Sequence, residues 1–357
     1  MHKRLDRATA QPFAAKKAEV LFRADQYRFR VLGEPIFDDE FDRETMAAIF
    51  KTHVANTLDD LSRLPELSTV RTALEVGAEC CQRAAAVENY FGLSCYAADI
   101  SLHALSSIES YAPELEFSRI PRRICCDITA LPFASNSFDL VFSYQTLHHF
   151  ANPLPVINEI HRVASQVYVG VEEPTKRLLQ LPLAYKRRGM YHKNELQKSD
   201  TRRFIEEIFL RRNCNEVRYG AIENFDIPLR FWKWMLESLF ECEWFRGPSI
   251  SATRANRLDF DPISIVKWTL YYSLAGTVVS WIARKQRTLQ QQNHPEAPTL
   301  ICPDCLLEFG SEIPLHQRGT RPWCSLCGSE YPVWENIVIL LPTKLRTRLY
   351  PVIIEDL

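Results

Sequence analysis

Four cysteines in the last part of the sequence have the spacing of a metal site. Cys302 and Cys305 form one Cys-x-x-Cys pair, and Cys324 and Cys327 form a second. Two such pairs supply the four thiolates of a tetrahedral zinc site, and a site filled by thiolates leaves no position open for a substrate. We therefore predict a structural Zn²⁺ ion bound by these cysteines in a small module at residues 299–345.

A second set of candidate residues lies where expected strands end. The apolar segment 73–76 runs into a turn at Gly77 and Ala78, and the next expected strand ends at Asp99. A nucleotide-type cofactor needs a tight turn, a nearby helix N-terminus and an acidic residue one strand later that accepts hydrogen bonds from the ribose hydroxyls. The order of these residues predicts a cofactor site in which Asp99 binds the ribose.

The elements that must position these residues are short apolar strands separated by helical segments. The expected strands are residues 73–76, 94–98, 123–126, 140–143 and 167–171. Such alternation is typical of a parallel sheet that is covered by helices on both faces. We predict an α/β Rossmann-like fold with a mostly parallel sheet over residues 71–225.

The remaining segments differ from this core in composition. Residues 1–70 are polar with helix-like apolar spacing, and two stretches between residues 226 and 289 are aromatic and apolar. A run rich in Gln, Asn and Pro precedes the cysteine module and lacks apolar periodicity. The predicted segments are a helical N-terminal extension at 1–70, a helical cap or insertion at 226–289, a linker at 290–298 and a C-terminal tail at 346–357.

The order of motifs in residues 71–175 resembles that of class I S-adenosylmethionine-dependent methyltransferases. An acidic turn and Asp99 are followed by Cys-Asp-Ile-Thr-Ala-Leu-Pro-Phe at 126–133, Ser-Phe-Asp-Leu-Val-Phe-Ser at 137–143 and Leu-His-His-Phe at 147–150. The resemblance implies that the chain transfers a methyl group from S-adenosylmethionine.

The resemblance also implies a role for each residue of the cofactor site. The implied contacts are Glu75, Gly77 and Ala78 with the methionine and ribose, Asp99 and Ile100 with the ribose, Asp127 and the Ile128 backbone with the adenine, and Gln145 with the surroundings of the donor methyl.

The sequence departs from the family pattern in the turn after the first strand. Glu79 and Cys81 stand where the family usually has glycines. A carboxylate there is compatible with the positive charge of S-adenosylmethionine, whereas it would repel the phosphates of a nicotinamide dinucleotide. This favours the methyl donor. The alternative is a non-catalytic, methyltransferase-like binding protein.

Candidate groups for proton transfer follow the fourth strand. Methyl transfer mainly requires that donor and acceptor be positioned, and it needs a base only when the acceptor carries a proton of high pKa. His148 and His149 lie near the expected mouth of the site and are the candidate catalytic residues, with Tyr144 and Tyr191 as further candidates. The alternative is that both histidines only pack or cap a helix.

The cysteine module resembles the small zinc-ribbon activator that pairs with tRNA and translation-factor methyltransferases. The resemblance covers residues 299–343 and includes Tyr331, Pro332 and the apolar run at 337–341. It implies a fused activator that packs on the catalytic sheet or covers apolar surface by strand addition.

Composition bears on location and on partners. The chain has 43 Lys and Arg against 44 Asp and Glu, so its net charge predicts no general attraction to nucleic acid or to anionic lipid. Eleven cysteines without an apolar signal segment at the N-terminus predict reduced thiols and a cytoplasmic protein.

The methyl acceptor is not identified by any motif. The aromatic segment at 226–289 suits an enclosed pocket, which favours a small metabolite or a glycan- or lipid-linked intermediate. The alternative acceptor is RNA, bound by basic residues around Arg187 and by the zinc ribbon. The apolar run at 263–283 is a candidate for peripheral membrane contact. No protein partner is specified.

Overall fold

The computed structural model describes residues 11–34, 42–175, 184–185, 210–211, 219–224, 227–250, 258, 278–286 and 297–351. The basic segment around Arg187, Tyr191 and most of the expected linker lie outside the described residues, as do residues 263–277 of the apolar run.

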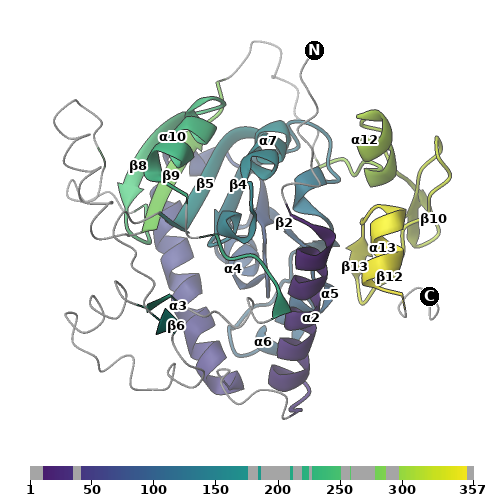
Figure 1. The fold of residues 1–357 in the computed structure, drawn as a ribbon, viewed down its shortest axis with the longest axis horizontal. Coiled ribbons are helices and arrows are strands. Elements are labelled where there is room, and N and C mark those ends of the chain that lie inside the picture. Colours follow the sequence, from purple (N-terminus) through teal and green to yellow (C-terminus); the bar gives the residue numbers. More distant parts are fainter. Residues whose placement is uncertain are drawn as a thin grey trace.

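A mostly parallel sheet forms the centre of the molecule (Figure 1). Its strands follow the order β12-β13-β3-β2-β1-β4-β5-β9-β8. The order β3-β2-β1-β4-β5 is that of a doubly wound α/β fold, and these five strands are parallel to one another. The predicted fold class and the five predicted strands are therefore confirmed. The strands are β1 (Thr72–Val76), β2 (Ser94–Asp99), β3 (Arg122–Cys125), β4 (Phe138–Tyr144), β5 (Ala164–Pro174), β8 (Glu241–Arg246), β9 (Val278–Arg284), β12 (Val333–Trp334) and β13 (Ile337–Ile339).

Helices cover both faces of this sheet. One face carries α3 (Arg43–Ser62), α4 (Gln82–Phe91), α5 (Leu102–Ser106) and α6 (Ile108–Tyr111), and α2 (Phe13–Arg30) packs beside α5. The other face carries α7 (Leu154–Val163) and α10 (Leu229–Glu237). Short 3₁₀ turns lie at η1 (Pro65–Ser68), η2 (Ile128–Ala130) and η3 (Leu147–His149), and β6 (Ala184–Tyr185) pairs with β7 (Leu210–Arg211) apart from the main sheet.

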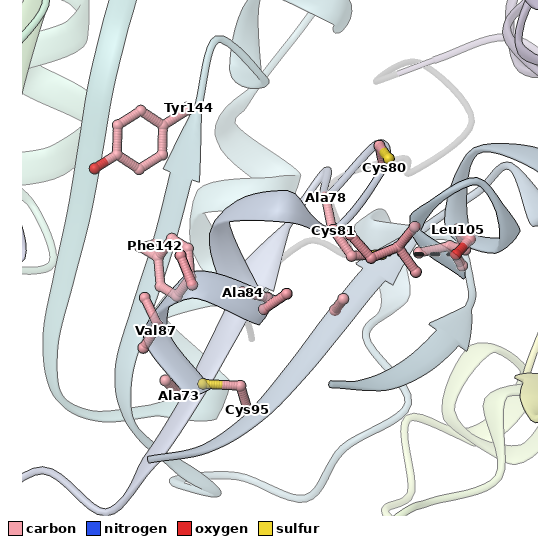
Figure 2. Packing of buried hydrophobic residues seen from close by; sticks show 14 of the residues in the cluster. Ala73, Ala78, Cys80, Cys81, Ala84, Val87, Cys95, Leu105, Phe142 and Tyr144 are labelled. Carbon is pink, nitrogen blue, oxygen red and sulfur yellow. Dashed lines mark hydrogen bonds between the residues drawn. The ribbon is translucent and has the colours of Figure 1, made fainter. Parts of the chain in front are cut away.

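Small side chains bring α4 close to the sheet. Figure 2 shows Ala84 and Val87 of α4 beside Ala73 of β1 and Cys95 of β2, and all four are buried. Because these side chains are short, the helix backbone can approach the strands closely. Helix α4 begins at Gln82, directly after the turn that follows β1.

The prediction of a helical cap at 226–289 is wrong for residues 241–246 and 278–284, which are strands. Among the described residues of this segment, α10 is helical, whereas β8 and β9 are strands that extend the sheet beyond β5. Strand β9 is antiparallel to both β5 and β8. Five consecutive residues of β9 are buried, so this strand lacks the alternation of apolar and polar residues that identifies a half-exposed strand.

The C-terminal module joins the opposite edge of the same sheet (Figure 1). Strand β13 pairs in parallel with β3, which is the strand addition expected as one of two modes of packing. The rest of the module is α12 (Pro303–Phe309), the hairpin of β10 (His316–Arg318) and β11 (Arg321–Trp323), and α13 (Thr343–Leu349).

The predicted boundary between the ribbon and the tail falls inside α13, so residues 346–351 continue the module. The Tyr350 hydroxyl donates to the Ile100 carbonyl at 2.7 Å and accepts from the Leu102 amide at 3.0 Å. The start of the predicted tail is therefore attached to the end of β2. No helix in the described part of the chain has the length and apolar character that crossing a membrane requires.

Gly170 tests the contact between β5 and β9. A Cβ atom at this position would lie 2.3 Å from Cε2 of the buried Trp281 ring. We expect Gly170→Ala to lower the free energy of unfolding by roughly 1–3 kcal/mol in urea denaturation, because the rigid ring must move. The loss in a Gly170→Ala/Trp281→Phe double variant should be smaller than the sum of the single losses, and additive losses would contradict this steric explanation.

Candidate functional site

The turn after β1 and the loop after β4 approach each other without space for a further side chain. A Cβ atom at Gly77 would lie 2.3 Å from Cγ2 of Thr146, and Gly77 has a φ of +69°. The Gly77 and Ala78 amides donate to the Ala98 carbonyl at 2.9 and 3.1 Å, which attaches this turn to the end of β2. The turn lies between β1 and β4, where the strand order reverses and open α/β sheets bind ligands.

Glu79 and Cys81 both have a left-handed backbone conformation, which favours glycine. Their φ angles are +47° and +60°, a region that costs a residue with a side chain roughly 1 kcal/mol. The Glu79 carboxylate accepts from Arg23 of α2 at 2.6 Å. Burial raises the pKa of Glu79, but Arg23 and other nearby cations outweigh it, so the pKa lies below its usual value. The carboxylate that distinguishes this turn is therefore ionised and paired.

Asp99 lies beside this turn, as the sequence predicts. Its carboxylate accepts from the Ser101 amide at 2.8 Å and from the Glu79 amide at 3.0 Å. Burial raises the pKa of Asp99 to about 6, and the two backbone hydrogen bonds only partly oppose this shift. Each carboxylate oxygen retains a lone pair for a further donor, so ribose hydroxyls can still bind. The neighbouring Ile100 carbonyl is occupied by the tyrosine at the end of α13.

Asp127, the implied adenine ligand, already has several partners within the chain. Oδ1 accepts from the Thr129 amide at 3.0 Å and from its hydroxyl at 2.7 Å. Oδ2 accepts from Lys16 of α2. Ile128, whose backbone is the second implied adenine contact, opens the 3₁₀ turn η2 and is buried. An adenine amino group must therefore share the Asp127 carboxylate with Lys16.

The Glu75 side chain is buried in the core, whereas the family resemblance implies that it contacts the cofactor. Its carboxylate is 1% exposed and accepts from the Ala84 amide in the first turn of α4 at 2.9 Å. Burial raises the pKa of Glu75 to about 8. The carboxyl group therefore stabilises the start of α4 from within the core, and the structure gives no support for a direct contact with the methionine part of a cofactor.

Helix α2 lies in the predicted N-terminal extension and covers the site, which the sequence analysis does not predict. Lys16 and Arg23 lie two helical turns apart, so both face the sheet, where they pair with Asp127 and Glu79. Gln11 donates to the His149 carbonyl at 3.3 Å. The sequence of α2 does not indicate which carboxylates these two cations pair with.

His148 is enclosed by two glutamates that no local sequence signal identifies. The fully buried Glu173 of β5 accepts from the amides of Thr146, Leu147 and His148 at 2.7, 2.7 and 3.1 Å. Its Oε2 also lies 3.0 Å from His148 Nδ1, while His148 Nε2 lies 3.4 Å from the Glu223 carboxylate.

The two carboxylates change the acid–base properties of His148. Burial lowers the pKa of His148, but hydrogen bonds and charges from Glu173 and Glu223 raise it overall to about 10. In the metal-free chain the ring is therefore protonated at neutral pH, and both of its nitrogens face carboxylates. This arrangement does not support His148 as a base that accepts a proton from a substrate.

Two other predicted site residues, Gln145 and Tyr144, differ in solvent exposure. Gln145 is exposed at the mouth of the site and has a φ of +51°. Its backbone N–H donates to the Val171 carbonyl at 3.0 Å. The Tyr144 hydroxyl is buried, lies 3.4 Å from Asp60 of α3 and has a pKa above its usual range because of burial. Gln145 is thus accessible to a ligand, whereas Tyr144 joins β4 to α3.

The four cysteines of the C-terminal module converge as the sequence predicts. Sγ of Cys302 lies 3.6 Å from that of Cys327, and Sγ of Cys305 lies 3.7 Å from that of Cys324. Zinc with four thiolates at about 2.3 Å places the sulfur atoms about 3.8 Å apart. The donor set and its spacing therefore fit a tetrahedral zinc ion.

The fold is that of a doubly wound α/β protein, and the turn after β1 lies where such sheets bind ligands. Residues 74–166 match a family model described as a methyltransferase domain. The match extends from β1 into β5 and includes Gly77, Asp99 and Asp127.

Individual relatives resemble only parts of the molecule or its general shape. A malonyl-[acyl-carrier protein] O-methyltransferase of Halorhodospira halophila is 33% identical over 132 residues, which cover 36% of this chain. The chain spans 43% of the length of that curated relative.

Two solved structures resemble the chain at low sequence identity. A geranyl diphosphate C-methyltransferase from Streptomyces coelicolor is 13% identical, with a TM-score of 0.46 over 78% of this chain and 100% of its own. A complex that contains the Trm112 methyltransferase activator of Haloferax volcanii gives 11% identity and a TM-score of 0.38, over 69% of this chain and 96% of the matched chain.

Glu173 provides a test of how the loop after β4 is held. Glu173→Gln replaces one acceptor oxygen by an amide nitrogen, which would then face a donor. We expect the free energy of unfolding in urea to fall by roughly 1–3 kcal/mol. The neighbouring and less buried Glu172 gives the matched control, Glu172→Gln, which should cost less. Equal losses in the two variants would show that the buried carboxylate does not hold this loop.

Proposed function

We propose that the chain is an S-adenosylmethionine-dependent methyltransferase with the cofactor bound between the turn after β1 and the loop after β4. The observation that carries this proposal is the position of the Asp99 carboxylate beside the Gly77 turn, inside the matched methyltransferase domain. A buried carboxylate with free lone pairs is suited to both hydroxyls of a ribose. Asp127 and the Ile128 backbone then contact the adenine.

Helix α2 is the cover of this site in the proposed enzyme. Its Lys16 and Arg23 neutralise two carboxylates at the mouth, which lowers the local excess of negative charge. A closed cover also excludes water from the methyl donor. The exposed Gln145 then lies on the open side, where the donor methyl meets the acceptor.

A small or lipid-linked acceptor is the proposed substrate class. Phe231 and Trp234 of α10 are 45% and 55% exposed and stack with ring centroids 5.2 Å apart. This aromatic pair offers an apolar surface that suits such an acceptor. The relative from Halorhodospira halophila methylates a malonyl group carried by a protein, which is one example of an acyl-linked acceptor.

The affinity for S-adenosylmethionine should depend on the ionisation of Asp99. Because the pKa of Asp99 in the free protein is about 6 and the carboxylate is the better acceptor, affinity should fall as pH drops below about 6. Asp99→Asn should bind roughly tenfold more weakly at pH 7.5 and lose this dependence. Isothermal titration across a pH series measures both effects.

The exposed Asp59 of α3 provides the control for this experiment, since Asp59→Asn should leave both affinity and its pH dependence unchanged. Unchanged affinity in Asp99→Asn would refute the ribose assignment. A folded wild-type protein that binds neither S-adenosylmethionine nor S-adenosylhomocysteine would instead be a non-catalytic binding protein, in which Lys16 and Arg23 close the site permanently.

We also propose that Cys302, Cys305, Cys324 and Cys327 bind one structural Zn²⁺ ion. The sulfur spacing supports this proposal, and four thiolates leave no coordination position for chemistry. The ion would keep the module folded against the sheet, where the Ile301 amide donates to the Pro132 carbonyl at 3.0 Å.

Loss of this zinc ion should destabilise the edge of the sheet as well as the module. We expect Cys302→Ser to lose the thiolate-bound zinc and to lower the melting temperature, because metal binding contributes directly to folding. Zinc analysis and differential scanning calorimetry measure the two effects. Cys242 lies outside the cluster and is half-buried, so Cys242→Ser is the matched control. Full zinc content in Cys302→Ser would refute the site.

A further inference from the structure

Four side chains from three segments converge beneath helix α2. His148 and His149 belong to η3, Glu223 follows in the segment 219–224, and Glu19 belongs to α2. We call these four residues the histidine–glutamate cluster. Glu223 lies 3.4 Å from His148 Nε2 and 3.4 Å from His149 Nδ1. The Glu19 carboxylate lies 3.9 Å from His149 Nδ1.

Two buried atoms of the cluster lack a hydrogen-bond partner among the described residues. They are Oε2 of Glu19 and Nδ1 of His149, which face each other. An isolated buried polar atom costs free energy unless something binds it. Oε1 of Glu19 is occupied by Arg23 Nε at 3.0 Å, so the side chain is held in place with its other oxygen directed at the cluster.

The position of His148 is set from outside the cluster. Glu173 contacts His148 Nδ1 at 3.0 Å, which directs Nε2 toward Glu223. A carboxylate that accepts from one ring nitrogen, while the other nitrogen faces further ligands, is the usual arrangement behind metal-bound histidines. Glu173 is itself held by three backbone amides, so this support is rigid.

The distances fit an ion held by His148, His149 and Glu223, whose ligand atoms all lie within 4.8 Å of one another, with the Glu19 carboxylate beside His149. Zinc bonds to imidazole nitrogen and carboxylate oxygen are about 2.0–2.2 Å long, which places tetrahedral ligand atoms about 3.4 Å apart. The observed separations of 3.4, 3.4 and 3.9 Å match this spacing, whereas they are long for direct hydrogen bonds. Three carboxylates, those of Glu19, Glu173 and Glu223, lie beside the two imidazoles and Arg23.

We propose that the histidine–glutamate cluster binds a divalent transition-metal ion of the Zn²⁺ type, separate from the thiolate site, and that this ion fastens helix α2 over the carboxyl end of the sheet. Imidazole ligands favour such ions over Mg²⁺ and Ca²⁺, which prefer oxygen ligands throughout. Binding at His148 Nε2 displaces any proton held there to solvent.

The proposed ion has a structural role, in which it joins α2 to the loop segments and does not contact substrate. The side chains of Glu19, Glu223, His148 and His149 are 12%, 6%, 7% and 18% exposed, so little surface remains for a fifth ligand from outside. His148, His149 and Glu223 supply three ligands, and the nearby Glu19 carboxylate would supply the fourth of a tetrahedral site. Of the three joined segments, α2 is the one that carries Lys16 and Arg23 to the proposed cofactor site.

The test uses the full-length chain after removal of metals by a chelator and dialysis against Zn²⁺. We expect about two zinc ions per chain by atomic emission, one at the thiolates and one at the cluster. Glu223→Gln and Glu19→Gln should each retain about one, and Cys302→Ser should also retain about one. Two cluster variants are used so that a folding defect in one of them does not decide the result. His161→Gln on α7, outside the cluster, is the control that should keep both ions.

Two further measurements identify which site is filled. Loading with Co²⁺ should give a thiolate charge-transfer band that depends on Cys302, together with weaker bands that disappear in Glu223→Gln. Hydrogen exchange of the α2 amides should slow severalfold with Zn²⁺ in the wild type and in Cys302→Ser, but not with Mg²⁺ and not in Glu223→Gln.

A single ion per chain that depends only on the cysteines would overturn the proposal, and so would α2 exchange that does not respond to Zn²⁺. The cluster would then be an ion-pair network only. These readouts require neither S-adenosylmethionine nor a methyl acceptor, so their outcome is independent of the proposed function.

Discussion

The absence of a side chain at Gly77 is the constraint on which the rest of the site depends. Thr146 occupies the space that a Cβ would need, and its hydroxyl donates to the Val76 carbonyl at 3.2 Å. The backbone of the turn after β1 can therefore contact the Thr146 side chain of the loop after β4 directly. The same turn is hydrogen-bonded to the Ala98 carbonyl at the end of β2. Asp99 is therefore held in a fixed position relative to the turn after β1 and the loop after β4.

The central strands and the cysteine site could be predicted because each has a local signal. Short apolar runs between turn residues identify β1 to β5, and two Cys-x-x-Cys pairs identify the metal donors. Strands β8 and β9 give no such signal. Apart from Ser280, residues 278–283 are all apolar, because both faces of β9 are buried, so this segment is equally compatible with a buried helix.

The parts of the site that could not be predicted are contacts between distant segments. Glu173 and Glu223 reach His148 from β5 and from a loop beyond it, and neither stands in a recognisable motif. The same holds for Lys16 and Arg23, whose partners lie at the ends of strands far along the chain. Such pairs follow from tertiary packing, which a single sequence does not specify.

The C-terminal module is an integral part of the sheet. Strand β13 covers the edge of β3, Arg162 of α7 pairs with Glu312 at 3.0 Å, and Arg123 of β3 donates to the Glu335 carbonyl at 2.9 Å. Side chains of Cys302, Cys305 and Tyr331 belong to the same buried cluster as α7 and β4. A cysteine module and a central sheet that share a core should unfold together.

The pairing of β13 with β3 has a consequence for biosynthesis. The ribosome makes β3 long before β13, so a nascent chain can assemble the first five strands while the outer edge of β3 still has unpaired amides and carbonyls. Exposed edges of this kind pair readily with other chains. The time needed to translate the intervening residues is thus a period in which this protein is prone to aggregate, and a chaperone or the arrival of the last strand ends it.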